Sequence, residues 1–112
     1  MDINAEYIDV DGALKRIGGN MGLFKKLLGR FIEGNNLEPL SEAAKSGNLE
    51  EAARLAHTLK GVSSNLSLTK VAALSADIEQ LFKNGGDFTA CLDELETAYA
   101  VTAGMIAEVT SG

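Results

Sequence analysis

The sequence predicts an all-α protein, an antiparallel four-helix bundle with a short additional N-terminal helix. Apolar residues recur at intervals of three and four along several long segments, and no segment shows the strict apolar alternation of a half-buried strand. Short links that contain Gly and Asn separate these segments, as in bundles of antiparallel helices. Because 112 residues suffice for one compact domain, we expect a single domain over residues 1–112.

A short opening segment and a longer helix are expected first. The opening segment ends at Gly18-Gly19 and has apolar residues at loose helical spacing, namely Ile3, Tyr7, Ile8, Leu14 and Ile17. The next helix begins after Asn20, a residue type that caps helices. Its apolar stripe comprises Met21, Phe24, Leu27, Leu28, Phe31 and Ile32.

The pattern weakens at Gly34-Asn35-Asn36, and Pro39 follows. Proline is tolerated in the first turn of a helix, so the chain either kinks here or restarts at Leu37 and continues to Gly47. The two halves can then stack as one bent helix.

Three further helices complete the predicted bundle. Asn48 followed by Glu51 has capping-box spacing and opens a helix that runs to about Leu66. A second helix stops at Gly85-Gly86 and has the stripe Val71, Leu74, Ser75, Ile78, Leu81 and Phe82. Asp87 can cap the last helix, whose stripe is Phe88, Cys91, Leu92, Leu95, Ala98, Tyr99, Thr102, Met105, Ile106 and Val109.

Composition and charge exclude several classes of function. With 16 acidic and 10 basic residues the net charge is −6, which disfavours a nucleic-acid partner because binding to phosphate backbones requires clustered Lys and Arg. No apolar run approaches the length of a membrane span, and the N-terminus shows no secretory signal, so we expect a cytoplasmic protein. Cys91 is the one cysteine and is expected to pack as a small buried residue.

His57, the single histidine, lies in the helix from Asn48 to about Leu66 but off its apolar stripe. At 100° per residue, it falls about 150° from the centre of that stripe, so the ring is predicted to face solvent. The stripe itself comprises Leu49, Ala52, Leu55, Ala56, Leu59, Val62 and Leu66.

Residues next to His57 on its face of the helix are small and have low helix propensity. Gly61 costs about 1 kcal/mol relative to Ala, and Gly61 and Ser64 leave the ring free of large neighbours on its own face. Arg54 and Lys60 place two cations beside it. A neutral imidazole is a nucleophile near neutral pH and can carry a phosphoryl group, whose charge Lys60 can offset. The alternative is an ordinary surface histidine beside a solvated lysine.

The segment from Ala56 to Leu68 resembles the signature of the histidine-containing phosphotransfer (HPt) domain family. His57 is followed by Lys at +3, Gly at +4, a small residue at +7 and an apolar residue at +11. The resemblance extends to the stretches 8–14, 28–31, 45–49 and 78–79, so it covers nearly the whole chain.

This resemblance implies that His57 is the phosphorylated nucleophile, that Lys60 is the charge partner of the phosphoryl group, and that Gly61 and Ser64 give clearance for docking. We expect Arg54 also to face the partner. Leu68 and Val71 are candidates for an apolar docking rim, with core packing as their alternative.

One position departs from the family pattern. Many members have Gly at +10, where this chain has Ser67, which either ends the helix or caps the next one.

The implied partners are response-regulator receiver domains and a hybrid sensor histidine kinase, with the chain acting as a monomer. We find no nucleotide-binding loop and no cluster of residues at metal-ligand spacing, so we expect no cofactor, no metal and no ATP-dependent kinase activity.

Two rival functions remain at this stage. A histidine-kinase dimerisation domain would place an acidic residue directly after the histidine, where this chain has Thr58. A helical adaptor would bind signalling partners without transferring anything.

Overall fold

The fold was analysed in a computed structural model, which describes residues 4–111. Six helices follow one another, and among the described residues no strand occurs. They are α1 (Val10–Arg16), α2 (Met21–Gly34), α3 (Leu37–Lys45), α4 (Leu49–Asn65), α5 (Thr69–Asn84) and α6 (Thr89–Ser111). Ile3, assigned above to the opening segment, lies outside the described residues.

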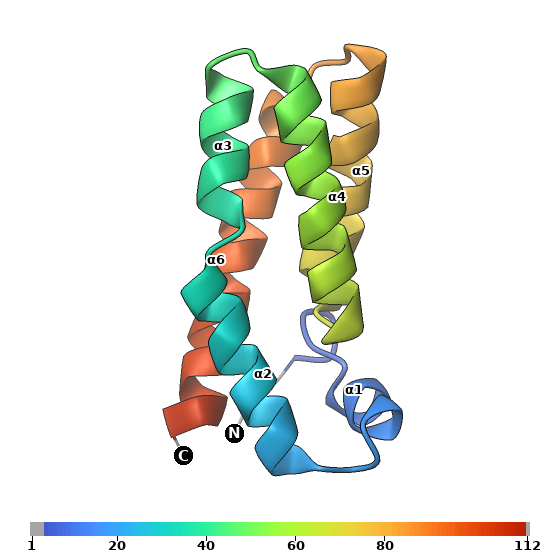
Figure 1. Cartoon of the computed structure of the whole chain (residues 1–112), viewed down its shortest axis with the longest axis vertical. Helices are drawn as coiled ribbons and strands as arrows, with labels where there is room; N and C mark the ends of the chain where they lie inside the picture. Colours follow the sequence, from blue (N-terminus) through green and yellow to red (C-terminus); the bar gives the residue numbers. More distant parts are fainter. Residues whose placement is uncertain (1–3, 112) are drawn as a thin grey trace.

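The helices form an antiparallel four-helix bundle, as predicted. In Figure 1, α2 and α3 ascend one after the other along one edge, α4 descends, α5 ascends and α6 descends. The short helix α1 lies at the lower end, beside the last turns of α4. The molecule is elongated, with principal extents of 41 × 22 × 21 Å.

The chain restarts between α2 and α3. Asn35 ends α2 in the left-handed conformation, with φ of 38°, which Asn tolerates better than most residues. Its side-chain amide donates to Oε2 of Glu38 at 2.9 Å. Pro39 follows in the first turn of α3, where its missing N–H removes no helical hydrogen bond. The prediction that the helix restarts at Leu37 is therefore correct. The two helices follow one another along the same edge of the bundle.

Side chains cap the helices where the sequence indicates. Asn20 accepts from the backbone N–H of Leu23, and Asn48 accepts from that of Glu51. The reciprocal hydrogen bond of a capping box, from the Asn48 N–H to the Glu51 side chain, is not formed, because this N–H donates to the carbonyl of Ala43. The carboxylate of Asp87 accepts from the N–H of Thr89 at 3.0 Å.

The apolar stripe predicted for α4 does face the core, and Ala53 and Ser63 are buried in addition to it. Ala52, Ala56, Leu59 and Leu66 are buried, and Leu49, Leu55 and Val62 are partly buried. Ser63, which lies outside the predicted stripe, is fully buried. Its hydroxyl donates to the carbonyl of Leu59 at 2.6 Å, so it is buried without an unsatisfied donor.

The joint between α4 and α5 is held by the N-terminal segment. Ser67 ends the connection from α4 in the left-handed conformation, with φ of 55°, and the N-cap of α5 is Leu68. The N–H of Asp9 donates to the Ser67 carbonyl at 2.9 Å. Arg16 of α1 donates to the Ser64 carbonyl at 2.9 Å and to the Ser67 hydroxyl. Of the two predicted alternatives for Ser67, ending the helix is correct.

No described helix combines the length and the apolar character needed to cross a membrane.

Candidate functional site

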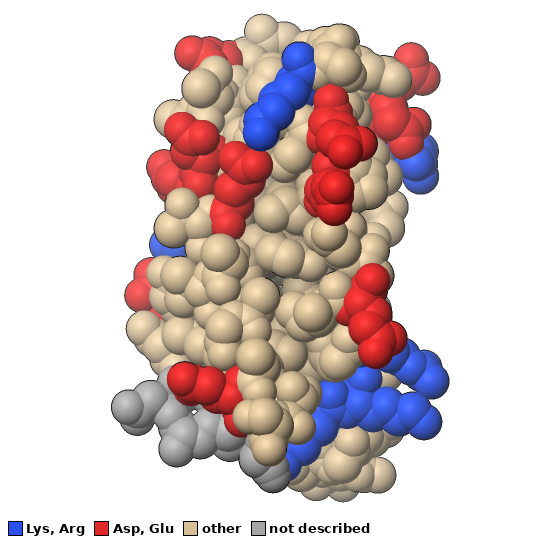
Figure 2. All heavy atoms as spheres, turned by 90° about the vertical axis from the view of Figure 1, so that its left-hand side faces the viewer, with Lys and Arg blue, Asp and Glu red and all other residues tan. Residues whose placement is uncertain are grey.

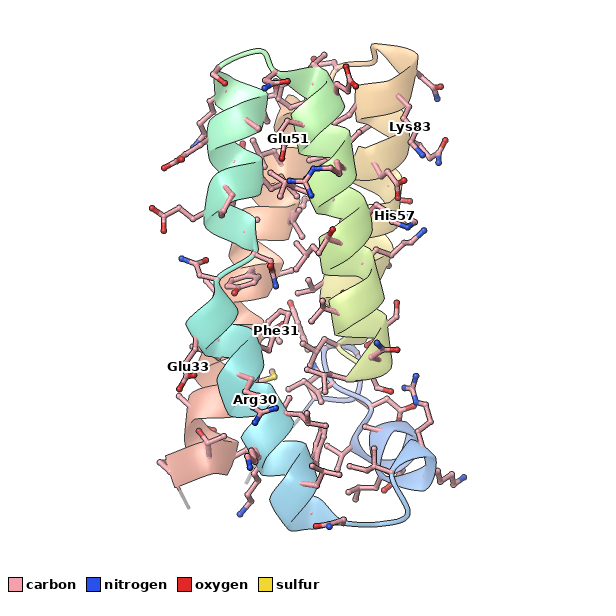
Figure 3. All side chains as sticks on the ribbon, in the orientation of Figure 1. Arg30, Phe31, Glu33, Glu51, His57 and Lys83 are labelled. Atoms are coloured by element: carbon pink, nitrogen blue, oxygen red, sulfur yellow. The ribbon has the colours of Figure 1, made fainter. Side chains whose placement is uncertain are left out.

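His57 stands on the surface of α4 beside α5. Its side chain is 68% exposed, which confirms the orientation predicted from the helical period. Figure 3 shows the ring at the outer edge of the boundary between these two helices. The ring is therefore within reach of a partner molecule.

The inner nitrogen of the ring meets a buried carboxylate. Nδ1 of His57 lies 3.3 Å from Oε2 and 3.4 Å from Oε1 of Glu79, on α5. The Glu79 side chain is only 4% exposed. Because an ionised carboxylate only accepts hydrogen bonds, we infer that Nδ1 carries the ring proton and that Nε2 retains its lone pair.

Two lysines share the same carboxylate. Lys83, one turn further along α5, places Nζ 2.8 Å from Oε2 of Glu79, and Lys60 places Nζ 3.6 Å from Oε1. The hydrogen bond from Lys83 is the main cause that lowers the pKa of Glu79, and it outweighs the effect of burial. His57 and Lys60 lower this pKa further. Glu79 is thus a buried anion stabilised by three basic groups.

A hollow of about 700 Å³ lies beside the ring, between α4 and α5. Ala53 and Phe82, both buried, are part of its lining, and His57, Thr58 and Lys83 border it. Arg54 borders the hollow too, but its guanidinium donates to Glu51, with Nε at 3.0 Å from Oε1. Arg54 is therefore paired with Glu51, whereas Lys83 contacts the Glu79 carboxylate that faces the ring.

Gly61 and Ser64 are both exposed, on the same side of α4 as His57. A Cβ added to Gly61 would meet no atom within 4 Å, and its φ is not in the left-handed region. Nothing within the described chain therefore requires glycine at this position.

The predicted apolar rim is wrong, because Leu68 and Val71 are both fully buried. The N-terminal segment covers this end of α5: Thr69 donates to the Glu6 carbonyl at 2.6 Å, next to the bond from Asp9 to Ser67. The sequence could not show this cover, since it joins residues about sixty positions apart.

A second hollow, of about 500 Å³, presents apolar surface between α1, α2 and α4. Ile17, Leu27, Phe31, Val62 and Leu66 contribute its apolar lining, and Arg16 and Arg30 lie on it as well. Figure 3 shows Arg30 and Phe31 on α2, facing the gap toward α4.

Much of the acidic charge lies away from His57. Figure 2 shows the face formed by α2, α3 and α6, where acidic side chains dominate the upper half. Glu38, Glu42 and Glu96 border one shallow pocket in that region. Basic side chains gather at the lower end, consistent with five Lys and Arg and no acidic residue between positions 12 and 32.

Over residues 4–111, no three His, Cys, Asp or Glu side chains come together in a way that could hold a metal ion.

A scan against family models matches the Hpt domain over residues 27–111. The chain belongs to the Hpt family. Hpt domains take part in histidine phosphotransfer in phosphorelay signalling, where they interact with receiver domains and histidine kinases. The match includes His57, Lys60 and Glu79 and begins within α2, so α1 precedes it. Searches of curated proteins and of solved structures return no match.

Sequence reasoning missed Glu79 and Lys83 as residues of the site. A partial signal was present, because they stand four residues apart at the edge of the apolar stripe of α5, where a Glu–Lys pair is favourable. Their proximity to His57 depends on how α5 packs against α4, which the period of neither helix specifies.

Proposed function

We propose that this Hpt domain is a phosphocarrier whose His57 accepts a phosphoryl group from the aspartyl phosphate of one receiver domain and passes it to another. The observation that carries the proposal is the exposed imidazole whose Nδ1 is held by the buried Glu79 carboxylate. A surface histidine without a function has no need of a buried anion behind it, since a buried charge costs free energy unless it is paired.

Nε2 is the nucleophile in this proposal. It attacks phosphorus, the bond between phosphorus and the carboxylate oxygen of the receiver breaks, and the electron pair leaves on that carboxylate. Nδ1 keeps its proton throughout, so the phosphorylated ring becomes an imidazolium. The Glu79 carboxylate, 3.3 Å from Nδ1, then faces a full positive charge and stabilises it.

Lys60 is the charge partner of the phosphoryl group. It lies one turn from His57 on α4, and its side chain is 38% exposed, so the ammonium can reach a group bonded to the ring. Positioning and charge neutralisation account for most of the catalysis in phosphoryl transfer.

The receiver docks across the exposed face of α4 that includes Gly61 and Ser64. Gly61 allows close approach of the partner, because no internal contact explains a glycine there. Val62, further round α4, lines the hollow that Phe31 and Arg30 also line. This hollow provides an apolar and cationic docking surface, whereas Leu68 is buried and cannot contact a partner. Cations there suit the acidic phosphorylation pocket of a receiver.

The functional unit spans residues 1–112 and acts as a monomer. The segment before the matched region is integral to the fold, since Ile8 and Ala13 are buried and Arg16 bonds the end of α4. A truncation to residues 27–111 should therefore be less stable than the full chain.

Incubation of the full chain with phosphorylated receivers tests the proposed function. Intact mass should rise by one phosphoryl group, and the modification should be lost in acid, as expected of a phosphoramidate. In His57→Gln the gain should vanish entirely, while the unfolding free energy changes by no more than about 1 kcal/mol, because the ring is largely exposed and Lys60 and Lys83 still pair with Glu79. A chain that binds receivers without any mass gain would instead be an adaptor.

A further inference from the structure

Lys83 stands out because it lies outside the sequence motif and yet makes the shortest ionic contact of the site. Its Nζ is 2.8 Å from Oε2 of Glu79, the same oxygen that Nδ1 of His57 approaches at 3.3 Å. Lys83 and the His57 ring therefore contact the same oxygen atom of Glu79. Figure 3 shows it on the helix next to His57, along the same boundary.

The side chain of Lys83 is free to move toward the phosphoryl group. It is 53% exposed and borders the hollow that His57 also borders. Lys60 approaches the other oxygen of Glu79, so the two ammonium groups stand on either side of the carboxylate behind the ring. Arg54, the other cation on this hollow, is bonded to Glu51.

Charge counting indicates what changes on phosphorylation. Before transfer, the ring is neutral and the two lysines outnumber the single carboxylate of Glu79. After transfer, the ring has become a cation and takes over the neutralisation of Glu79, while a dianionic phosphoryl group has appeared. With both lysines the phosphorylated cluster is neutral, whereas with Lys60 alone it keeps one negative charge in excess.

We propose that Lys83 is a second cation of the phosphoryl site, bound to Glu79 in the resting protein and shifted to the phosphoryl oxygens once His57 is modified. This inference rests on the proposed function. Lys83 then contributes to the reaction twice, because it first keeps Glu79 ionised behind the ring and afterwards offsets the charge of the phosphoryl group.

The test uses phosphoramidate as a small donor, so that no receiver contact is involved. Its P–N bond breaks with loss of ammonia, and a new P–N bond forms to Nε2 of His57. The pKa of the attached phosphoryl group is then measured by phosphorus NMR titration. Loss of a neighbouring cation in Lys83→Met should raise this pKa by about half a unit or more. At equilibrium with a phosphorylated receiver, acceptance by the variant should fall about three- to tenfold.

Lys70→Met is the matched control. Lys70 lies on the same helix and its Nζ is 3.2 Å from the Glu6 carboxylate, so the variant also loses one surface ion pair and one positive charge. It should leave the titration of the phosphoryl group unchanged, and Lys83→Arg should restore the value of the unmodified sequence. If Lys83→Met does not fold, Lys83→Gln provides the same comparison.

The outcomes separate the two proposals. If the natural sequence takes up no phosphoryl group from phosphoramidate or from any receiver, the proposed function is wrong. If it is phosphorylated on His57 and Lys83→Met shows the same phosphoryl titration and the same acceptance, only the role of Lys83 is wrong.

Discussion

In the middle of α4 and just after its end, the residue type disagrees with the backbone conformation, but in opposite directions. At Gly61 the backbone is ordinary helix, where any residue would fit, and yet the sequence has the residue that destabilises a helix. At Ser67 the backbone has φ of 55°, where glycine is favoured, and yet the sequence has a residue with a Cβ. The two positions are six residues apart.

The surroundings explain the difference. Gly61 is exposed, with no atom near its missing Cβ, so nothing within the described chain offsets its cost in stability. In the proposed function, the close approach of a receiver provides the reason for glycine at this position. Ser67 is buried, and its hydroxyl accepts a hydrogen bond from Arg16 of α1, so its strain is compensated inside the domain. Substitutions around Gly61 should therefore alter transfer, and substitutions around Ser67 should alter stability.

Arg16→Ala should give the largest change in stability. The guanidinium donates to the Ser64 carbonyl and to the Ser67 hydroxyl, and its loss leaves a carbonyl at the end of α4 without that donor. We expect the unfolding free energy to fall by about 2 kcal/mol in urea denaturation. Phosphorylation of His57 by phosphoramidate should keep its rate.

Lys15→Ala is the control for Arg16→Ala. It removes the neighbouring positive charge from α1, and Lys15 is exposed and takes part in no ion pair among the described residues. Equal losses in the two variants would mean that net charge, and not the joint, is responsible.

Gly61→Ala should separate stability from transfer. A Cβ fits without a clash, so the helix should gain about 1 kcal/mol in unfolding free energy. Transfer from a phosphorylated receiver should slow about tenfold, because the methyl group keeps the partner from its close approach. The rate with phosphoramidate, which needs no such approach, should not change.

Gly104→Ala provides the comparison for Gly61→Ala. Gly104 is also exposed, lies within α6 and has no atom within 4 Å of an added Cβ. It should give a similar gain in stability with unaltered transfer. A Gly61→Ala variant that transfers at the normal rate from the receiver would contradict the docking role of this face.

The same contrast shows what a sequence can and cannot predict. The exposure of His57 and the burial of Leu59 follow from the period of one helix, so both were predictable. The burial of Leu68 was not, because its cover is the segment around Glu6 and Asp9, far away in the chain. Glu79 and Lys83 were missed for a related reason, since the rotation of α5 against α4 decides which of its side chains reach His57.

Low pH should weaken the ionic contacts of Glu79 beside His57 more than the contacts of Arg16 at the joint between α4 and α5. The pKa of Glu79 lies below its ordinary value of 4.5, chiefly through Lys83, so the native protein holds fewer protons at this group than the unfolded chain. The resulting stability is present above pH 4.5 and is lost as pH falls through the native pKa. In Glu79→Gln, the difference in unfolding free energy between pH 7 and pH 3 should be smaller than in the natural sequence, as measured by urea denaturation at the two pH values.

Glu94→Gln removes an exposed carboxylate of α6 that pairs with no Lys or Arg in the described part of the chain, and it serves as the reference for this titration. An acid dependence that is identical in both variants would show that the pKa of Glu79 is not lowered in the native protein.

Ser67→Gly should have the smallest effect, because two contributions oppose each other. Glycine relieves the strain of a positive φ, worth about 1 kcal/mol, but it removes the hydroxyl that accepts from Arg16, worth about as much. The net change in unfolding free energy should stay within about 0.5 kcal/mol. In an Arg16→Ala background the hydrogen bond is already absent, so the same substitution should stabilise by about 1 kcal/mol. A double-mutant cycle in urea measures this coupling, and additive effects would show that Arg16 does not compensate the strained backbone at Ser67.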